Sequence, residues 1–154
     1  MSPEFLAHLC SRGAAIQDRW RRLLHVEPVA GPLANPEALE HLIPLALAQI
    51  LDFCGNRTRR SPSLQKARIE LPGCECGHNP YRAFFAAAEQ ALTEEAVLVQ
   101  AAQAPAARAP NDLAALIYAI RVIAGMEIDT FCSVCTHQGT ARRCRFTGAK
   151  SAAG

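Results

Sequence analysis

Three dipeptides that pair a small polar residue with proline constrain the fold of this 154-residue chain more than any other feature. They are Ser2-Pro3, Asn35-Pro36 and Asn79-Pro80. A serine or asparagine side chain caps the first amides of a helix, and proline suits the first helical position because no hydrogen bond is needed there. Each pair therefore predicts a helix start. A fourth start is expected near Asn111-Asp112, where an acid falls in the first turn.

Apolar residues three or four apart follow each start, which is the helical period. The expected inward faces are Phe5, Leu9, Ile16, Trp20 and Leu23; Leu39, Leu42, Ile43, Ala46, Leu47, Ile50 and Cys54; Tyr81, Phe84, Phe85, Ala88, Leu92 and Val99; and Leu113, Leu116, Ile117, Ile120, Val122, Ile123, Met126, Ile128 and Phe131. Gly13 should weaken the first of these helices and Pro44 should kink the second. Half of the residues are apolar and few β-branched or aromatic runs occur, so an all-α fold is expected.

The lengths of the last two expected helices indicate which ends meet. One runs from Pro80 to about Gln103, and the other starts near Asp112 after a short proline-containing link, so the two should form an antiparallel hairpin. Each has roughly 24 residues, or roughly 36 Å at the helical rise. Equal lengths place the start of one beside the end of the other. We predict a four-helix up-and-down bundle over residues 1–139 and a basic tail over 140–154.

Two pairs of cysteines flank this expected meeting point. Cys74 and Cys76 lie just before Asn79-Pro80, and Cys132 and Cys135 lie in the last turn of the final helix. Residues three apart on a helix point the same way. Four converging thiolates can bind either zinc or an iron–sulfur cluster. We predict a metal site from these four cysteines, with zinc favoured because closed four-ligand zinc sites are a well-attested structural class.

Other cysteines and histidines have different expected roles. His78, His137 and Cys144 are candidate additional ligands because they lie close to the cysteine pairs in the sequence. Cys10 and Cys54 fall near apolar helical faces, where cysteine behaves as a small buried hydrophobe, so we expect both in the core. The odd total of seven cysteines argues against a fully paired disulfide framework.

The thiols are expected in a reducing compartment. The segment from Met1 to Phe5 lacks the features of a secretory signal, and no run approaches the ~20 uninterrupted apolar residues of a membrane span. We therefore expect a cytoplasmic protein without a membrane partner. In that compartment, clustered cysteines bind metal or do redox chemistry more often than they form structural bridges.

Basic residues gather in two segments that flank the helix pair. They are Arg57, Arg59, Arg60, Lys66 and Arg68 in one and Arg142, Arg143, Arg145 and Lys150 in the other. If the helices alternate in direction, both segments lie at the cysteine end and form a positive rim. Solvated loop charge is the simpler interpretation, and an acidic protein partner is the functional one. Nucleic acid is a further alternative, but neither a recognition helix nor a stacking motif supports it.

Three functions from different classes fit these patterns. The leading hypothesis is a small metal-binding regulatory or sensor protein. A thiol–disulfide redox protein that uses Cys132 and Cys135 is one alternative, although such pairs normally occur in a βαβ setting. A helical interaction module with incidental thiols is the other. The sequence contains no nucleophile–base–acid arrangement, phosphate-binding glycine loop or paired carboxylate site, so a non-enzymatic role is favoured over an enzymatic one.

The N-terminal third of the chain carries a family resemblance. The segment Asp18-Arg19-Trp20-Arg21-Arg22-Leu23-Leu24 is followed by Pro32-Leu33-Ala34-Asn35-Pro36 and an amphipathic helix. This arrangement resembles the helical N-terminal sensor modules of RsbR-type stress regulators and related bacterial signalling proteins. The resemblance implies a non-enzymatic regulatory bundle. The cysteine cluster is not part of that family's pattern, so no functional residue is carried over.

Overall fold

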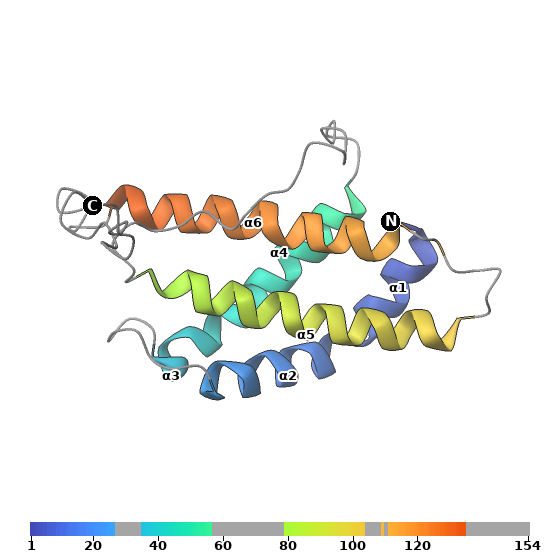
Figure 1. The fold of residues 1–154 in the computed structure, drawn as a ribbon, viewed down its shortest axis with the longest axis horizontal. Coiled ribbons are helices and arrows are strands. Elements are labelled where there is room, and N and C mark those ends of the chain that lie inside the picture. Colours follow the sequence, from blue (N-terminus) through green and yellow to red (C-terminus); the bar gives the residue numbers. More distant parts are fainter. Residues whose placement is uncertain (27–34, 57–78, 104–108, 110, 135–154) are drawn as a thin grey trace, which may run out of the picture.

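The computed structural model describes residues 1–26, 35–56, 79–103, 109 and 111–134. All regular elements in these ranges are helical and none is a strand, which confirms the all-α class. In chain order they are α1 (Pro3–Ser11), α2 (Gly13–Val26), α3 (Pro36–Leu39), the 3-10 turn η2 (Glu40–Leu42), α4 (Ile43–Gly55), α5 (Pro80–Ala102) and α6 (Asp112–Val134) (Figure 1).

The helix starts lie where the polar–proline pairs predict them. The side chains of Ser2, Asn35 and Asn79 accept hydrogen bonds from backbone amides two or three residues further along, at 3.3, 3.2 and 2.9 Å. Each bond satisfies an amide that has no partner within its own helix, and such a cap typically contributes about 1 kcal/mol. The last helix begins at Asp112, as the acidic first turn predicts.

Gly13 and Pro44 divide the first two predicted helices. The first ends at Ser11 and resumes at Gly13 as α2. In the second, the 3-10 turn separates α3 from α4, which begins one residue before Pro44. Proline has no amide hydrogen, and its ring clashes with the carbonyl four residues earlier, here that of Glu40. The regular helix is therefore interrupted at the position where a kink is predicted.

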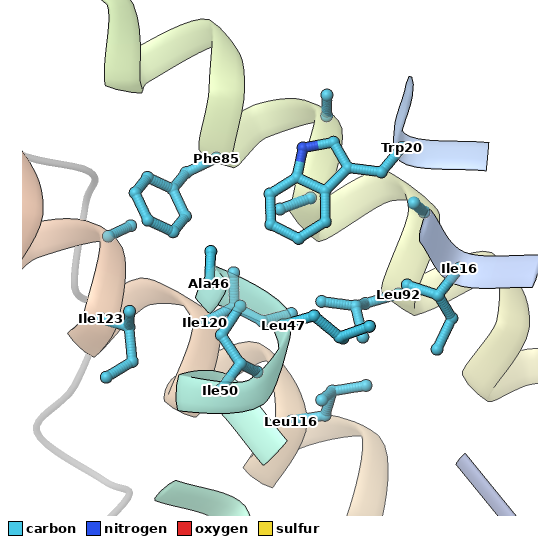
Figure 2. Packing of buried hydrophobic residues seen from close by; sticks show 14 of the residues in the cluster. Ile16, Trp20, Ala46, Leu47, Ile50, Phe85, Leu92, Leu116, Ile120 and Ile123 are labelled. Carbon is cyan, nitrogen blue, oxygen red and sulfur yellow. The ribbon is translucent and has the colours of Figure 1, made fainter. Parts of the chain in front are cut away.

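Most of the predicted inward residues form the core between α2, α4, α5 and α6 (Figure 2). Trp20 is fully buried, and its indole N–H donates a hydrogen bond to the carbonyl of Phe84 at 3.0 Å. The rings of these two residues lie 4.7 Å apart. A large aromatic side chain with its polar atom satisfied thus joins α2 to α5.

Two residues that were predicted to lie in the core, Cys10 and Met126, are exposed, and helix geometry explains both. Cys10 is exposed because it follows the buried Leu9 by one residue, which places it about 100° around α1. Met126 is 61% exposed because it lies two residues from both Ala124 and Ile128, which are buried. Residues two apart on a helix point in nearly opposite directions. The other predicted core cysteine, Cys54, is buried as expected.

The predicted antiparallel hairpin is formed by α5 and α6, each of which contains 23 residues. Arg121 of α6 pairs with Glu89 of α5 at 2.7 Å within the hairpin. At its end, the side-chain amide of Asn79 donates to the carbonyl of Ile128 at 3.2 Å. The start of α5 therefore lies beside the last turns of α6, as equal helix lengths predict (Figure 1).

The orientation of α4 relative to α1 and α2 agrees with the predicted alternating bundle. Glu40, just before α4, accepts hydrogen bonds from Arg21 at 3.1 Å and pairs with His25 at 2.7 Å near the end of α2. Gly55, at the end of α4, lies beside the side chain of Leu6 in α1. Since α1 and α2 progress from Leu6 toward His25, α4 runs in the opposite direction to them.

The same test shows that α5 also runs opposite to α1 and α2. Trp20 contacts Phe84 early in α5, whereas Arg12 contacts Glu95 later in α5. Both α4 and α5 are thus antiparallel to α2, so they are parallel to one another (Figure 1). The prediction of strict up-and-down alternation is wrong.

The length of the connection over residues 57–78 permits this topology. Short loops force neighbouring helices to be antiparallel, but an extended chain spans up to about 3.3 Å per residue. A connection of this length can therefore join opposite ends of the bundle, and its extra closure entropy is small because that entropy grows only logarithmically with length.

One helical stretch in the described part of the chain, Pro36–Gly55, is long and apolar enough to span a membrane by length and composition alone. Its Ile43, Leu47 and Ile50 are buried in the core of this fold, and its Glu40 is ion-paired. Core helices of soluble proteins meet the same criteria, so the stretch is weak evidence for a membrane span.

Candidate metal centre

The candidate site lies where α5 begins and α6 ends. Asn79 caps α5 and is only 3% exposed. Its Oδ1 accepts a hydrogen bond from the amide of Tyr81 at 2.9 Å. Its Nδ2 donates to the carbonyl of Ile128 at 3.2 Å and to Sγ of Cys132 at 3.4 Å. One buried side chain therefore joins the cap of α5 to the last turns of α6.

The electrostatic setting of Cys132 combines two helix ends. Cys132 lies near the C-terminal end of α6, where the helix dipole is negative. The N-terminal end of α5, where the dipole is positive and the first amides have no helical partner, lies against it. The carboxamide of Asn79 adds a further donor. The dipole of α5 and the carboxamide of Asn79 favour negative charge on a ligand at the junction, whereas the C-terminal end of α6 opposes it.

An aromatic cluster lies beside the junction. The ring of Tyr81 meets that of Phe131 edge-on, with centroids 5.7 Å apart, and its other neighbours are Phe84 and Phe85. Cys132 is half-buried and packs against the same core. Apolar surroundings of this kind limit the access of water to a bound ion and strengthen its interactions with nearby donors.

Of the four predicted ligands, only Cys132 lies within the described residues. Those outside are Cys74, Cys76 and Cys135, together with the additional candidates His78, His137 and Cys144. Within the described ranges no group of three or more His, Cys, Asp or Glu side chains could hold a metal ion. The convergence of the two helix ends is confirmed, whereas the four-cysteine centre stays a prediction.

All nine arginines and lysines of the predicted basic rim lie outside the described residues. The proposed tail over 140–154 lies outside them as well. The expected position of the rim depended on alternating helices. In this fold the end of α4 and the start of α5 lie at opposite ends of the bundle, so the described chain that precedes the basic segment ends away from the candidate metal centre.

Sequence reasoning missed a set of ion pairs that join α5 to α1 and α2. Arg12 donates to Glu95 at 2.8 Å, and Arg19 donates to Glu94 at 2.6 and 3.0 Å. Hydrogen bonds from Arg19 and, second, from Gln90 lower the pKa of Glu94 to about 2. No local spacing in the sequence indicates these pairs, because the partners lie more than seventy residues apart.

A second missed contact joins the start of α1 to the start of α6. Asp112 is 3% exposed, and its carboxylate accepts hydrogen bonds from the amide of Ser2 at 2.7 Å and from the hydroxyl of Ser2 at 2.6 Å. The sequence indicated Asp112 only as an acid that complements the helix dipole. Its contact with Ser2 stabilises the end of the bundle opposite the candidate metal centre.

Comparisons with known proteins add no relatives. No protein-family model matches the chain, and neither the curated proteins nor the solved structures include a match. The resemblance of the N-terminal third to RsbR-type sensor modules therefore stays an expectation. The function has to be inferred from the chain's own residues.

Proposed function

We propose that this is a small metal-binding regulatory or sensor protein with a four-cysteine site at one end of a helical bundle. The proposed ligands are Cys74, Cys76, Cys132 and Cys135. Zinc is the favoured occupant and an iron–sulfur cluster is the alternative. Four protein ligands leave no open coordination position on zinc, which suits a structural or regulatory site better than a catalytic one.

The hydrogen bond from Asn79 to Cys132 carries the proposal, because it holds the chain before α5 next to the last turn of α6. Cys76 and Cys74 precede Asn79 by three and five residues. An extended chain spans at most about 3.6 Å per residue, so their Cα atoms lie within roughly 11 and 18 Å of the Asn79 Cα atom. Both thiols are therefore within chain reach of Cys132.

The proposed metal would act at the junction of two helices. Bound zinc would link the chain before α5 to the end of α6, so that metal binding and the stability of this end are coupled. An iron–sulfur cluster would make the same junction sensitive to oxygen or redox state, since such clusters are oxidisable. In either case the ligand thiols bind in their deprotonated form.

Protein purified without oxygen tests the proposal through its metal content and visible spectrum. We expect one zinc per chain, or iron with sulfide and a brown colour that bleaches in air. Cys132→Ser should lose most of the metal. Cys10→Ser is the matched control because Cys10 is exposed on α1 and is not a proposed ligand. Wild-type protein without metal, or a Cys132→Ser variant with full metal content, would contradict the proposal.

A helical interaction module is a second candidate, which the exposed apolar side chains of α4 and α6 favour. Leu45 is 66% exposed, Met126 61% and Phe53 38%. The rings of Phe53 in α4 and Tyr118 in α6 have centroids 6.4 Å apart, so apolar side chains of the two helices adjoin there, and an apolar surface patch often marks an interaction site. If the thiols are incidental, Cys74→Ser should leave the melting temperature unchanged, whereas the loss of a true structural ligand should lower it strongly.

We further propose a reducing, cytoplasmic location and an acidic protein partner for the two basic segments. The odd count of seven cysteines supports the location, because clustered cysteines in reducing compartments more often bind metal than form structural disulfides. The basic clusters support the partner, because opposite charge steers association. Binding to that partner should weaken steeply between low and physiological ionic strength, and binding that is insensitive to salt would contradict this assignment.

A further inference from the structure

Two asparagine–proline caps in this fold have similar backbones but different surroundings. Asn35 has φ −57° and ψ 123°, and Asn79 has φ −72° and ψ 114°. Each accepts a hydrogen bond from the amide two residues further along. Asn35 is exposed, whereas Asn79 is 3% exposed. Capping uses only the side-chain oxygen, so it does not explain why the nitrogen of Asn79 is directed into the protein.

That nitrogen is directed at the turn of α6 that carries Cys132. A carboxamide nitrogen has two hydrogens to donate. The nitrogen of Asn79 makes two contacts, one with the carbonyl of Ile128 and one with Sγ of Cys132. In an α-helix the amide of residue 132 bonds to the carbonyl of residue 128, so both acceptors belong to the same turn. The contact with Ile128 fixes the direction of the nitrogen, and the remaining hydrogen then reaches the sulfur.

We propose that Asn79 is a positioning residue for the metal centre, where its carboxamide donates a hydrogen bond to the metal-bound sulfur of Cys132. This inference rests on the proposed function. Four thiolates around one zinc ion leave a net charge of −2, because the four negative charges exceed the two positive ones. Hydrogen bonds to the sulfurs offset that excess and orient the ligands. The carboxamide of Asn79 is a donor of this kind, 3.4 Å from the sulfur of Cys132.

The choice of substitutions separates this role from capping. Asn79→Ser keeps a capping oxygen but removes the amide donor. Asn79→Asp keeps the oxygen geometry of the cap, and it replaces the donor with a negative charge facing the sulfur. Aspartate and serine are both good caps, so a capping role alone predicts that Asp serves at least as well as Ser. Because the Asp carboxylate would also face the carbonyl of Ile128, the unfolding free energy of each variant without metal measures that structural cost separately. A role in donating to the thiolate predicts that Asp is the more damaging change.

Cobalt(II) is the probe, because it enters tetrahedral thiolate sites and gives a sulfur-to-metal absorption band. We expect Asn79→Ser to weaken cobalt binding about tenfold to a hundredfold, which is typical when a partner of a metal ligand is lost. Asn79→Asp should weaken it further, and both should shift the band. Asn35→Ser makes the same change at the matched exposed cap, and we expect it to leave the affinity within about twofold of wild type.

Each outcome supports or overturns a separate part of the reasoning. If the wild type binds cobalt and both Asn79 variants bind it equally well, the role of Asn79 is refuted while the metal centre stands. If Asn79→Asp binds cobalt as well as or better than Asn79→Ser, Asn79 serves only as a cap. A wild-type chain that binds neither cobalt nor zinc and that holds no iron–sulfur cluster when purified without oxygen overturns the metal centre and this inference together. If Asn79→Ser does not fold, the comparison of Asn79→Asp with wild type decides.

Discussion

Substituting Trp20 with phenylalanine should destabilise the bundle by an amount that the structure allows us to work out. Trp20 is fully buried between α2 and α5, and its indole N–H donates to the carbonyl of Phe84. Phenylalanine fits within the same space and keeps an aromatic ring near that of Phe84. It removes the donor and leaves the volume of the second indole ring empty. The substitution therefore costs stability in two ways, through a lost hydrogen bond and through a cavity.

Both costs have known magnitudes. Leaving a buried polar group without its partner costs about 1–3 kcal/mol. We expect about 1 kcal/mol here, because the carbonyl of Phe84 still accepts a backbone hydrogen bond within α5. The unfilled volume adds about 1 kcal/mol, since cavity costs rise with the residual volume. We expect a decrease of about 2 kcal/mol in the free energy of unfolding. That is a large part of the 5–15 kcal/mol typical of a domain.

Urea unfolding followed by circular dichroism measures this change without relying on the single tryptophan of the chain. Phe53→Leu is the control, because Phe53 is 38% exposed and its ring lies 6.4 Å from that of Tyr118. We expect the control to cost less than about 1 kcal/mol. A Trp20→Phe variant that is no less stable than the control would refute the reasoning and show that the centre of the core lies elsewhere.

Two further predictions concern polar contacts between helices. Asp112→Asn should lower the free energy of unfolding by about 2 kcal/mol, because an amide cannot accept both hydrogen bonds from Ser2 and loses the charge that strengthens them. Thermal unfolding of this variant and of the exposed control Asp129→Asn checks the prediction, and equal melting temperatures of the two variants would contradict it. For Glu94, the folded-state pKa of about 2 lies below the usual 4.5, so its stabilising effect is present above pH 4.5 and is lost as the pH falls toward 2. The effect should be small because the side chain is 41% exposed. Arg19→Gln should remove the larger part of it and leave the contribution of Gln90, which acid titration of stability in both proteins can test.

The sequence by itself determined the local features of the fold. Capping chemistry is confined to a few neighbouring residues, so Ser2, Asn35 and Asn79 indicated helix starts without knowledge of the rest of the chain. The break before Pro44 follows from the geometry of proline alone. Period and length also predicted most of the core and the meeting of α5 with α6, because a short link leaves two equal helices only one compact arrangement.

The candidate site was predictable to the same extent and no further. Equal helix lengths brought the start of α5 next to Cys132, and cysteine spacing indicated the chemistry expected there. The contact of Asn79 with that sulfur carried no sequence signal, because an asparagine before a proline is already explained as a cap. Its second role depends on which surface of another helix the carboxamide nitrogen meets.

Only the tertiary structure decided how the helices run relative to one another and which charges pair. The long connection over residues 57–78 permits either direction for α5 relative to α4, so the parallel orientation of the two helices follows from packing rather than from the loop. The pairs of Arg12 with Glu95 and of Arg19 with Glu94 likewise join residues distant in the sequence. Local rules act over a few residues, whereas these contacts depend on the simultaneous burial of faces from several helices.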